Sequence, residues 1–148
     1  MKETDQLAAL LPQESIAYAE RMNMPYLGYH LFRETLTSSL LGDSESAILY
    51  WLGKDIGRKI PIRSAAGIVL PFMRLGLGQL DLVEDSEQRV HYKLSHAMFH
   101  YMPEERLSRT LSLECGIVAG AIEVWRERET TAELMLEKKS DIRIIATH

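Results

Sequence analysis

The chain has 148 residues, of which 46% are hydrophobic and 26% charged, and its formal net charge is −4. This composition is that of one ordinary globular domain and excludes a wholly disordered chain. A chain of this length buries enough surface to fold without a disulfide or a structural metal. Non-specific nucleic-acid binding depends on clustered Lys and Arg. The sequence has no such cluster, so we expect no nucleic-acid partner.

The cysteine content and the hydropathy pattern indicate where the protein works. The single cysteine, Cys115, cannot form an internal disulfide, which fits a reducing compartment. Residues 1–15 contain no uncharged run long enough for the core of a signal peptide. No stretch approaches the roughly 20 apolar residues that span a bilayer. We therefore expect a cytoplasmic protein without a membrane span.

The chain divides into an N-terminal extension and one domain. Residues 1–26 predict a helical extension that is interrupted at Pro12. Residues 27–148 predict a single α+β domain. Within it, residues 30–41 predict a helix that ends before Gly42, a residue typical of helix C-termini. The apolar and small residues of this helix form one face and its polar residues fill the other: Leu31, Phe32, Thr35, Leu36, Ser39 and Leu40 against Arg33, Glu34, Thr37 and Ser38.

The next helix is expected over residues 45–59. Ile48, Leu52 and Ile56 form an apolar stripe at helical spacing, and Pro61 ends the helix. The same helix contains two glycines four residues apart, which lie on one face. Glycine is unfavourable inside a helix unless something requires it. We interpret the pair as a face that a second backbone approaches closely, although the glycines could instead loosen the helix.

A third helix, over residues 111–125, is apolar almost all round, so it must be packed on most of its sides. Gly116 and Gly120 are again four apart and predict another face of close approach. Each costs about 1 kcal/mol of helix propensity relative to alanine. The domain is therefore expected to be built around this central helix.

The remaining segments predict a short helix and two hairpins. Residues 64–77 predict a helix in which Pro71 either causes a kink or starts a second helical segment. Alternating apolar residues predict four strands. These strands pair as one hairpin of residues 79–83 with 90–94 and a second of residues 131–137 with 142–147. The fold class is thus α+β: an antiparallel sheet of two hairpins with helices packed on one face.

Few residues form a pattern with catalytic or metal-binding chemistry. His96 and His100 would share a helical face, but the zinc-protease pattern needs Glu where Ala97 stands, so no metal site is expected. Cys115, beside Glu114 and followed by apolar residues, is expected to be buried and unreactive. Glu114 itself points away from the polar side of its helix. It lies either near the helix start, where the dipole favours it, or in contact with a partner or ligand.

Three segments carry a resemblance to known families. Residues 115–123, CGIVAGAIE, resemble the glycine-containing helix of transport-particle (TRAPP) subunits. Residues 75–83 are similar to the helix-to-strand junction of 4-vinyl-reductase domains, and residues 46–57 to their early helix. The whole chain looks most like the YslB family of uncharacterised bacterial proteins. The resemblance implies the α+β fold that TRAPP subunits, 4-vinyl-reductase domains and haem-based nitric-oxide sensors share.

The resemblance also implies small-molecule or partner-subunit binding and dimerisation, but it stops short of specific activities. Ala119 stands where TRAPP subunits typically have Arg, and no cysteine follows Cys115 as in 4-vinyl-reductase domains. No histidine can be assigned as a haem ligand. Vesicle tethering, metal use and gas sensing therefore do not carry over, and no cofactor is expected.

Three functions remain as hypotheses. The first is a non-catalytic module that forms a homodimer and encloses a small apolar ligand, with a candidate pocket lined by Trp51, Cys115, Val118 and Ile122. The second is a structural or protein-interaction protein without a ligand. The third is an enzyme, for which Glu114 with His91 or His100 is a loose constellation. We favour the first and expect the protein not to be an enzyme.

Overall fold

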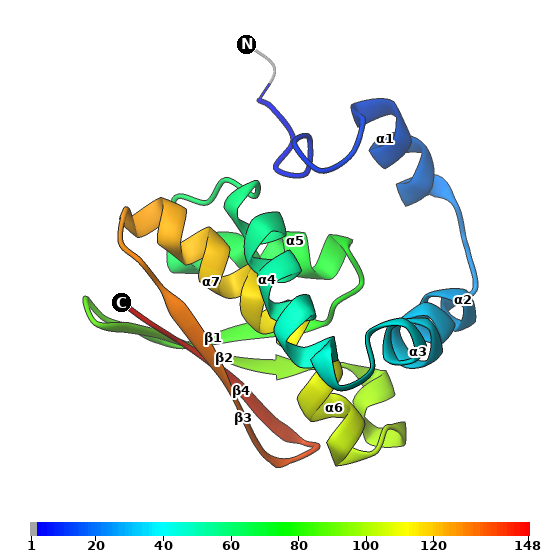
Figure 1. Cartoon of the computed structure of the whole chain (residues 1–148). Coiled ribbons are helices and arrows are strands. Elements are labelled where there is room, and N and C mark those ends of the chain that lie inside the picture. The colour runs from blue at the N-terminus through cyan, green and yellow to red at the C-terminus, as the bar shows by residue number, and fades with distance from the viewer. Residues whose placement is uncertain (1–2) are drawn as a thin grey trace.

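The computed structural model describes residues 3–148 and places helices against one antiparallel sheet (Figure 1). The strands are in the order β1-β2-β4-β3. Each hairpin pairs as expected, with Leu82 opposite Tyr92 in the first and Leu134 opposite Ile144 in the second. The α+β class and both hairpins are confirmed. The strand bounds are β1 (Gln79–Asp85), β2 (Arg89–Ser95), β3 (Thr131–Lys138) and β4 (Asp141–Thr147).

Helices precede the first hairpin and connect it to the second. The predicted segment around Pro71 forms two pieces, and the proline lies in the first turn of the second piece, α5, where its missing N–H is tolerated. Before the sheet lie α1 (Gln13–Arg21), α2 (Tyr26–Leu31), the π-helical turn η1 (Phe32–Leu36), α3 (Thr37–Leu41), η2 (Gly42–Ser44), α4 (Glu45–Arg58), η3 (Ala65–Ile68) and α5 (Val69–Arg74). Between the hairpins lie η4 (Ala97–Tyr101), α6 (Glu104–Thr110) and α7 (Ser112–Arg126).

The central helix α7 packs against α4 through the predicted glycines. A methyl group added at Gly116 would overlap the carbonyl oxygen of Tyr50, and one added at Gly120 would overlap that of Lys54. Gly53 and Gly57 of α4 meet the α7 backbone in the same way. The predicted close approach of both helices is confirmed. Between α4 and the sheet, α7 is buried along most of its length (Figure 1).

The helical run from α2 to α3 is oriented with its apolar residues toward solvent. The helix predicted over residues 30–41 is present and begins earlier, at Tyr26. Leu31 is 54% and Leu40 72% exposed, whereas Arg33 and Thr37 are turned toward the rest of the domain. Ion pairs and hydrogen bonds attach this polar side of the run to the domain, and the Tyr29 ring packs against the core beside them.

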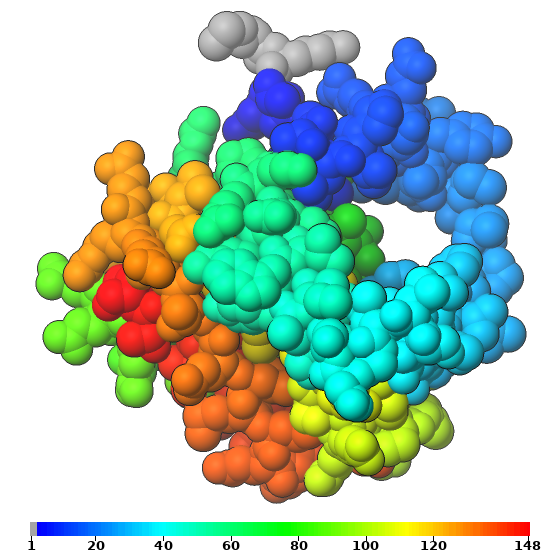
Figure 2. All heavy atoms as spheres, in the orientation of Figure 1, coloured from blue at the N-terminus to red at the C-terminus, as the bar shows by residue number. Residues whose placement is uncertain are grey.

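An N-terminal arm, residues 3–21, docks on the domain near α5. Its Leu7 and Ile16 are buried, and Arg74 of α5 pairs with Asp5 at 2.7 Å and with Glu20 at 2.6 Å. Figure 2 shows an open gap between this arm and the helices α2 and α3. Among residues 3–148, no helix is both long enough and apolar enough to cross a membrane.

Candidate functional site

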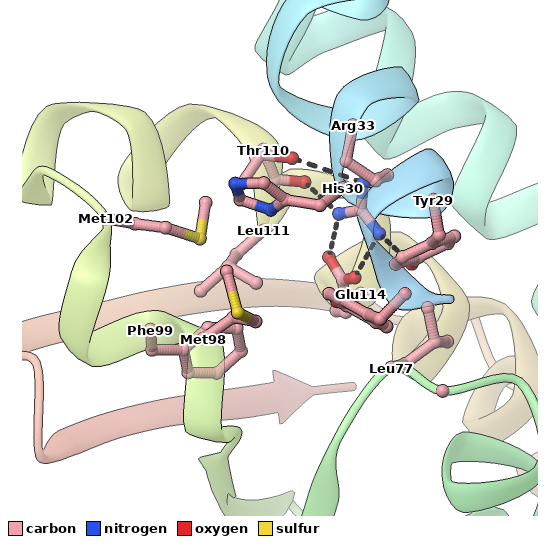
Figure 3. Close-up of a pocket in the computed structure, with 12 residues that line it drawn as sticks. Tyr29, His30, Arg33, Leu77, Met98, Phe99, Met102, Thr110, Leu111 and Glu114 are labelled. Carbon is pink, nitrogen blue, oxygen red and sulfur yellow. Dashed lines mark hydrogen bonds and ion pairs between the residues drawn. The ribbon is translucent and has the colours of Figure 1, made fainter. Parts of the chain in front are cut away.

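A small pocket lies where α2, the turn after α5, η4 and the start of α7 meet (Figure 3). Its cavity volume is about 20 Å³, which is room for roughly one water molecule. Aromatic rings, thioethers and aliphatic side chains dominate its lining. The lining residues are Tyr26, Tyr29, His30, Arg33, Gly76, Leu77, Met98, Phe99, Met102, Thr110, Leu111 and Glu114.

A buried ion pair forms one wall of the pocket. The two terminal nitrogens of Arg33 donate to the two carboxylate oxygens of Glu114, at 2.7 and 2.9 Å. Glu114 is 1% exposed, although it is charged. A bidentate pair of this kind is strong and fixes the geometry of both groups. Glu114 lies in the first turn of α7, which is the first of the two positions considered for it in the sequence. It contacts Arg33 of the same chain.

The remaining donors of Arg33 are also occupied. Its Nε donates to the Thr110 hydroxyl at 3.3 Å, and Nη2 donates to the Thr110 carbonyl at 2.9 Å. Nη1 donates to the Tyr29 hydroxyl at 2.7 Å. A guanidinium has five N–H donors, so all of them are used within the chain. Burial lowers the pKa of the Arg33 guanidinium, but the charge and hydrogen bonds of Glu114 outweigh burial and raise that pKa, so Arg33 stays protonated.

Aromatic rings cover the pocket on the side of α2. The Tyr26 ring lies 5.1 Å from the Tyr29 ring and 5.2 Å from the His96 ring, and His96 lies 5.4 Å from Phe99. Burial raises the pKa of Tyr26 to about 12, so its hydroxyl is neutral. The Nδ1 atom of His96 accepts a hydrogen bond from the backbone N–H of Met98 at 3.0 Å, which caps η4.

The sequence positions the pocket side of α2 by simple helical spacing. Tyr26, Tyr29, His30 and Arg33 follow one another at i, i+3, i+4 and i+7 and therefore share a face. Sequence reasoning missed this set because it took Arg33 as part of a polar face. The spacing of three aromatic rings and an arginine on one helical face could have indicated this side of the pocket. The π-helical turn begins just before Arg33, and such turns are frequent at functional sites.

The four residues predicted to line a pocket lie elsewhere. Cys115, Val118 and Ile122 are brought together in the buried core, and burial raises the pKa of the Cys115 thiol. Trp51 of α4 is 59% exposed, with the ammonium of Lys54 5.6 Å from its ring centre. The glycine-lined faces of α4 and α7 meet each other, so Trp51 is separated from the other three. None of the four lines the pocket described above.

The loose catalytic constellation is not assembled either. His91 of β2 lies 3.3 Å from a guanidinium nitrogen of Arg143, and His100 packs edge-on against Tyr101. Within residues 3–148, no hydrogen bond joins either histidine to Glu114, and no group of three or more His, Cys, Asp or Glu is arranged to hold a metal ion.

Comparisons with known proteins agree with this fold. Uncharacterized protein YslB from Bacillus subtilis (strain 168) is 25% identical over 129 residues, which cover 87% of this chain and 87% of that protein. A vinyl-4-reductase family protein from Methanocaldococcus jannaschii has a TM-score of 0.60 and 15% identity, over 99% of this chain and 98% of that chain. The expected resemblances to YslB and to the 4-vinyl-reductase fold are confirmed. The model of a family described as protein of unknown function (DUF2507) matches residues 26–147, and the chain therefore belongs to that family.

Proposed function

We propose that this protein is a non-catalytic, cytoplasmic module that binds a small apolar ligand and forms a homodimer. The observation that supports ligand binding is the lining of the pocket beneath α2. Its rings and thioethers, among them Phe99, Met98 and Met102, surround a space on one side of which the polar groups already have hydrogen-bond partners. Ligand sites are typically mostly apolar with a few fixed polar groups.

The proposed ligand is neutral, because the positive charge of Arg33 is already paired with Glu114. Its five N–H donors are occupied by Glu114, Thr110 and Tyr29. An anionic ligand would have to displace Glu114 and leave that carboxylate buried without a partner, which is costly. A neutral ring or hydrocarbon gains dispersion contacts and needs no such exchange. The same fully occupied ion pair supports a non-catalytic role.

Ligand entry requires α2 to move outward, because the closed pocket holds only about 20 Å³. Helix α2 suits this role, since none of its residues is buried. Met98 and Met102 on the opposite wall have flexible side chains that adapt to different shapes. The proposal is thus a pocket that opens by displacement of α2 and closes over its occupant.

Native and denaturing mass spectrometry of the purified protein test this proposal. We expect a dimer with extra mass that disappears on denaturation, and the difference gives the mass of the ligand. Met98→Trp should fill the pocket and abolish the extra mass. Met135→Trp makes the same change on the outer face of the sheet, at a position 42% exposed, and should retain it. A bare protein that also fails to bind neutral dyes such as Nile red would refute the ligand.

A protein-interaction role without a ligand is the second candidate. It is favoured by the number of large apolar side chains that the run from α2 to α4 exposes, including Leu27 at 75% and Leu40 at 72%. Exposed apolar patches mark interaction sites. A dimer of bare chains would support this candidate, whereas a bare monomer would point to a different protein as the partner.

A further inference from the structure

We propose that the homodimer forms through one uncharged surface, and that the occupant of this surface is a second copy of the chain. The surface consists of the outward residues Leu27, Leu31, Leu36 and Leu40 of the run from α2 to α3, together with Ile48 and Trp51 of α4. We call it the uncharged face. Helices α3 and α4 lie next to each other on the molecular surface (Figure 2). The inference rests on the proposed dimer and names its interface.

The charges in this part of the chain are turned inward. Residues 26–53 contain four Asp, Glu, Lys or Arg residues. The side chain of Arg33 is 13% exposed, that of Glu34 21% and that of Glu45 0%, and each has an ionic partner inside the domain. Asp43, in the turn η2, is the exposed exception in this range. Just beyond it on α4, Asp55 is also exposed and pairs with Arg58 at 3.1 Å. Free protein surfaces are rich in charge, whereas the centres of interfaces are depleted of it.

The π-helical turn η1 keeps the leucines of this surface in line. In a continuous α-helix, Leu31 and Leu36 would point in directions roughly 140° apart, since each residue turns the helix by about 100°. The wider turn absorbs one extra residue. Leu31 and Leu36 therefore project as residues four apart do in an α-helix. The same turn also contains Arg33, whose side chain pairs with Glu114 on the inner side of the run.

The surface is large enough for a stable dimer. A large side chain that is half exposed presents on the order of 100 Å². With Phe32 and Leu52 at its border, which are 57% and 50% exposed, the uncharged face approaches the ~800 Å² per partner of a standard interface.

A second copy fits this surface better than an unrelated protein. In a two-fold dimer the same patch meets itself, so a charge near the two-fold axis faces an identical charge and is repelled by it. A face without charges avoids this repulsion. It also offers no charge pattern by which a different partner would be selected.

Sedimentation equilibrium of single variants of the full chain tests the interface. Leu31→Glu places two like charges within it and should weaken self-association by at least about 30-fold. Val124→Glu makes a matched change on α7, at a helical position 51% exposed compared with 54% for Leu31, and should leave the dimer intact. A dimer that resists Leu31→Glu, or a wild-type protein that is monomeric at 100 μM or so, would overturn the proposal.

A cysteine variant tests the same surface without removing an apolar side chain. Thr35 is exposed between Leu31 and Leu36, and the natural thiol, Cys115, is buried. A thiol-specific cross-linker with a flexible spacer should link Thr35→Cys into a dimer, while it should not link Val124→Cys. Equal cross-linking of the two variants contradicts the interface even if Leu31→Glu fails to fold. A wild-type monomer that retains ligand mass would refute the dimer and leave the ligand proposal standing.

Discussion

Two of the helical contacts in this domain differ in what brings the helices together. Helices α4 and α7 meet backbone to backbone at glycines, and Glu123 of α7 also pairs with Lys54 at 3.0 Å and with Arg58 at 2.7 Å. The run from α2 to α3 is attached by side chains at a distance from its backbone, chiefly through Arg33 and Glu114. The first contact leaves no room for an added atom at its glycines, whereas the second is held by several side-chain pairs, including Arg33 with Glu114 and Glu34 with Arg106. The second contact also lies beside the pocket, so it is the one that the proposed opening of α2 would change.

Breaking the Arg33–Glu114 pair should have the largest effect. Arg33→Met leaves the Glu114 carboxylate buried without a partner, which typically costs about 3–5 kcal/mol. Urea unfolding followed by circular dichroism measures the loss. The double variant Arg33→Met with Glu114→Leu should recover much of it, because no charge is then left unpaired.

A surface ion pair provides the control for that experiment. Arg89 pairs with Glu84 at 2.7 Å, but both side chains are largely exposed. Arg89→Met should therefore change the free energy of unfolding much less than Arg33→Met, because exposed pairs contribute little. Equal losses from the two variants would mean that the buried pair does not attach the run from α2 to α3 to the domain.

Glycine-to-alanine changes should have opposite signs in the two regions. Gly120→Ala places a methyl group against the Lys54 carbonyl, and overpacking of this kind costs roughly 1–3 kcal/mol. Gly28→Ala on α2 meets no atom within 4 Å and should stabilise the helix by up to about 1 kcal/mol. Thermal unfolding of both variants checks the signs. A Gly120→Ala protein with an unchanged melting temperature would argue against close approach of α4 and α7.

The α4–α7 contact could be predicted because both of its sides are visible in the sequence. Each helix has two glycines four apart, and such glycines have a function only if another backbone comes close. The hairpins were predictable for a similar reason, since alternation of apolar residues is a local signal.

The orientation of the run from α2 to α3 could not be predicted in the same way. Helical periodicity placed Leu31, Leu36 and Leu40 on the broad apolar half of the helix, but it did not show which way that half points. The direction is set by the pairing of Arg33 with Glu114, which are 81 residues apart. No local pattern contains that pairing.

The residues expected to line a pocket differ from those of the pocket described here for a related reason. An excess of apolar positions suggested Cys115, Val118 and Ile122, but these complete the ordinary core. The pocket described here needs walls from α2, η4 and the turn at Gly76. The spacing from Tyr26 to Arg33 could have indicated one wall. The approach of the others depends on tertiary structure.

The smallest expected effect is a pH dependence of the free energy of unfolding, which arises where α2 packs on the residues around η4. The His96 ring lies 5.2 Å from the Tyr26 ring of α2, and burial lowers the pKa of His96 even though a hydrogen bond with the Gly76 backbone acts in the opposite direction. In the unfolded chain its pKa is about 6.5. As the pH falls below that value, the unfolded chain binds a proton that the folded chain does not, so the free energy of unfolding decreases. Above about pH 7 both states are neutral and this contribution is constant.

His96→Asn isolates this contribution, because an asparagine oxygen can still accept from Met98 N–H and does not titrate. Urea unfolding between about pH 7 and pH 5 should show a shallower loss of stability in His96→Asn than in the wild type. The pKa of His91 on β2 is also lowered, so His91→Gln measures how much of the pH dependence of unfolding comes from that histidine. The lowered carboxyl pKa values, such as that of Glu45, act at lower pH, where those groups titrate in the unfolded chain. If His96→Asn keeps the full slope, protonation of His96 does not weaken the packing between η4 and α2, and the sensitivity belongs to His91.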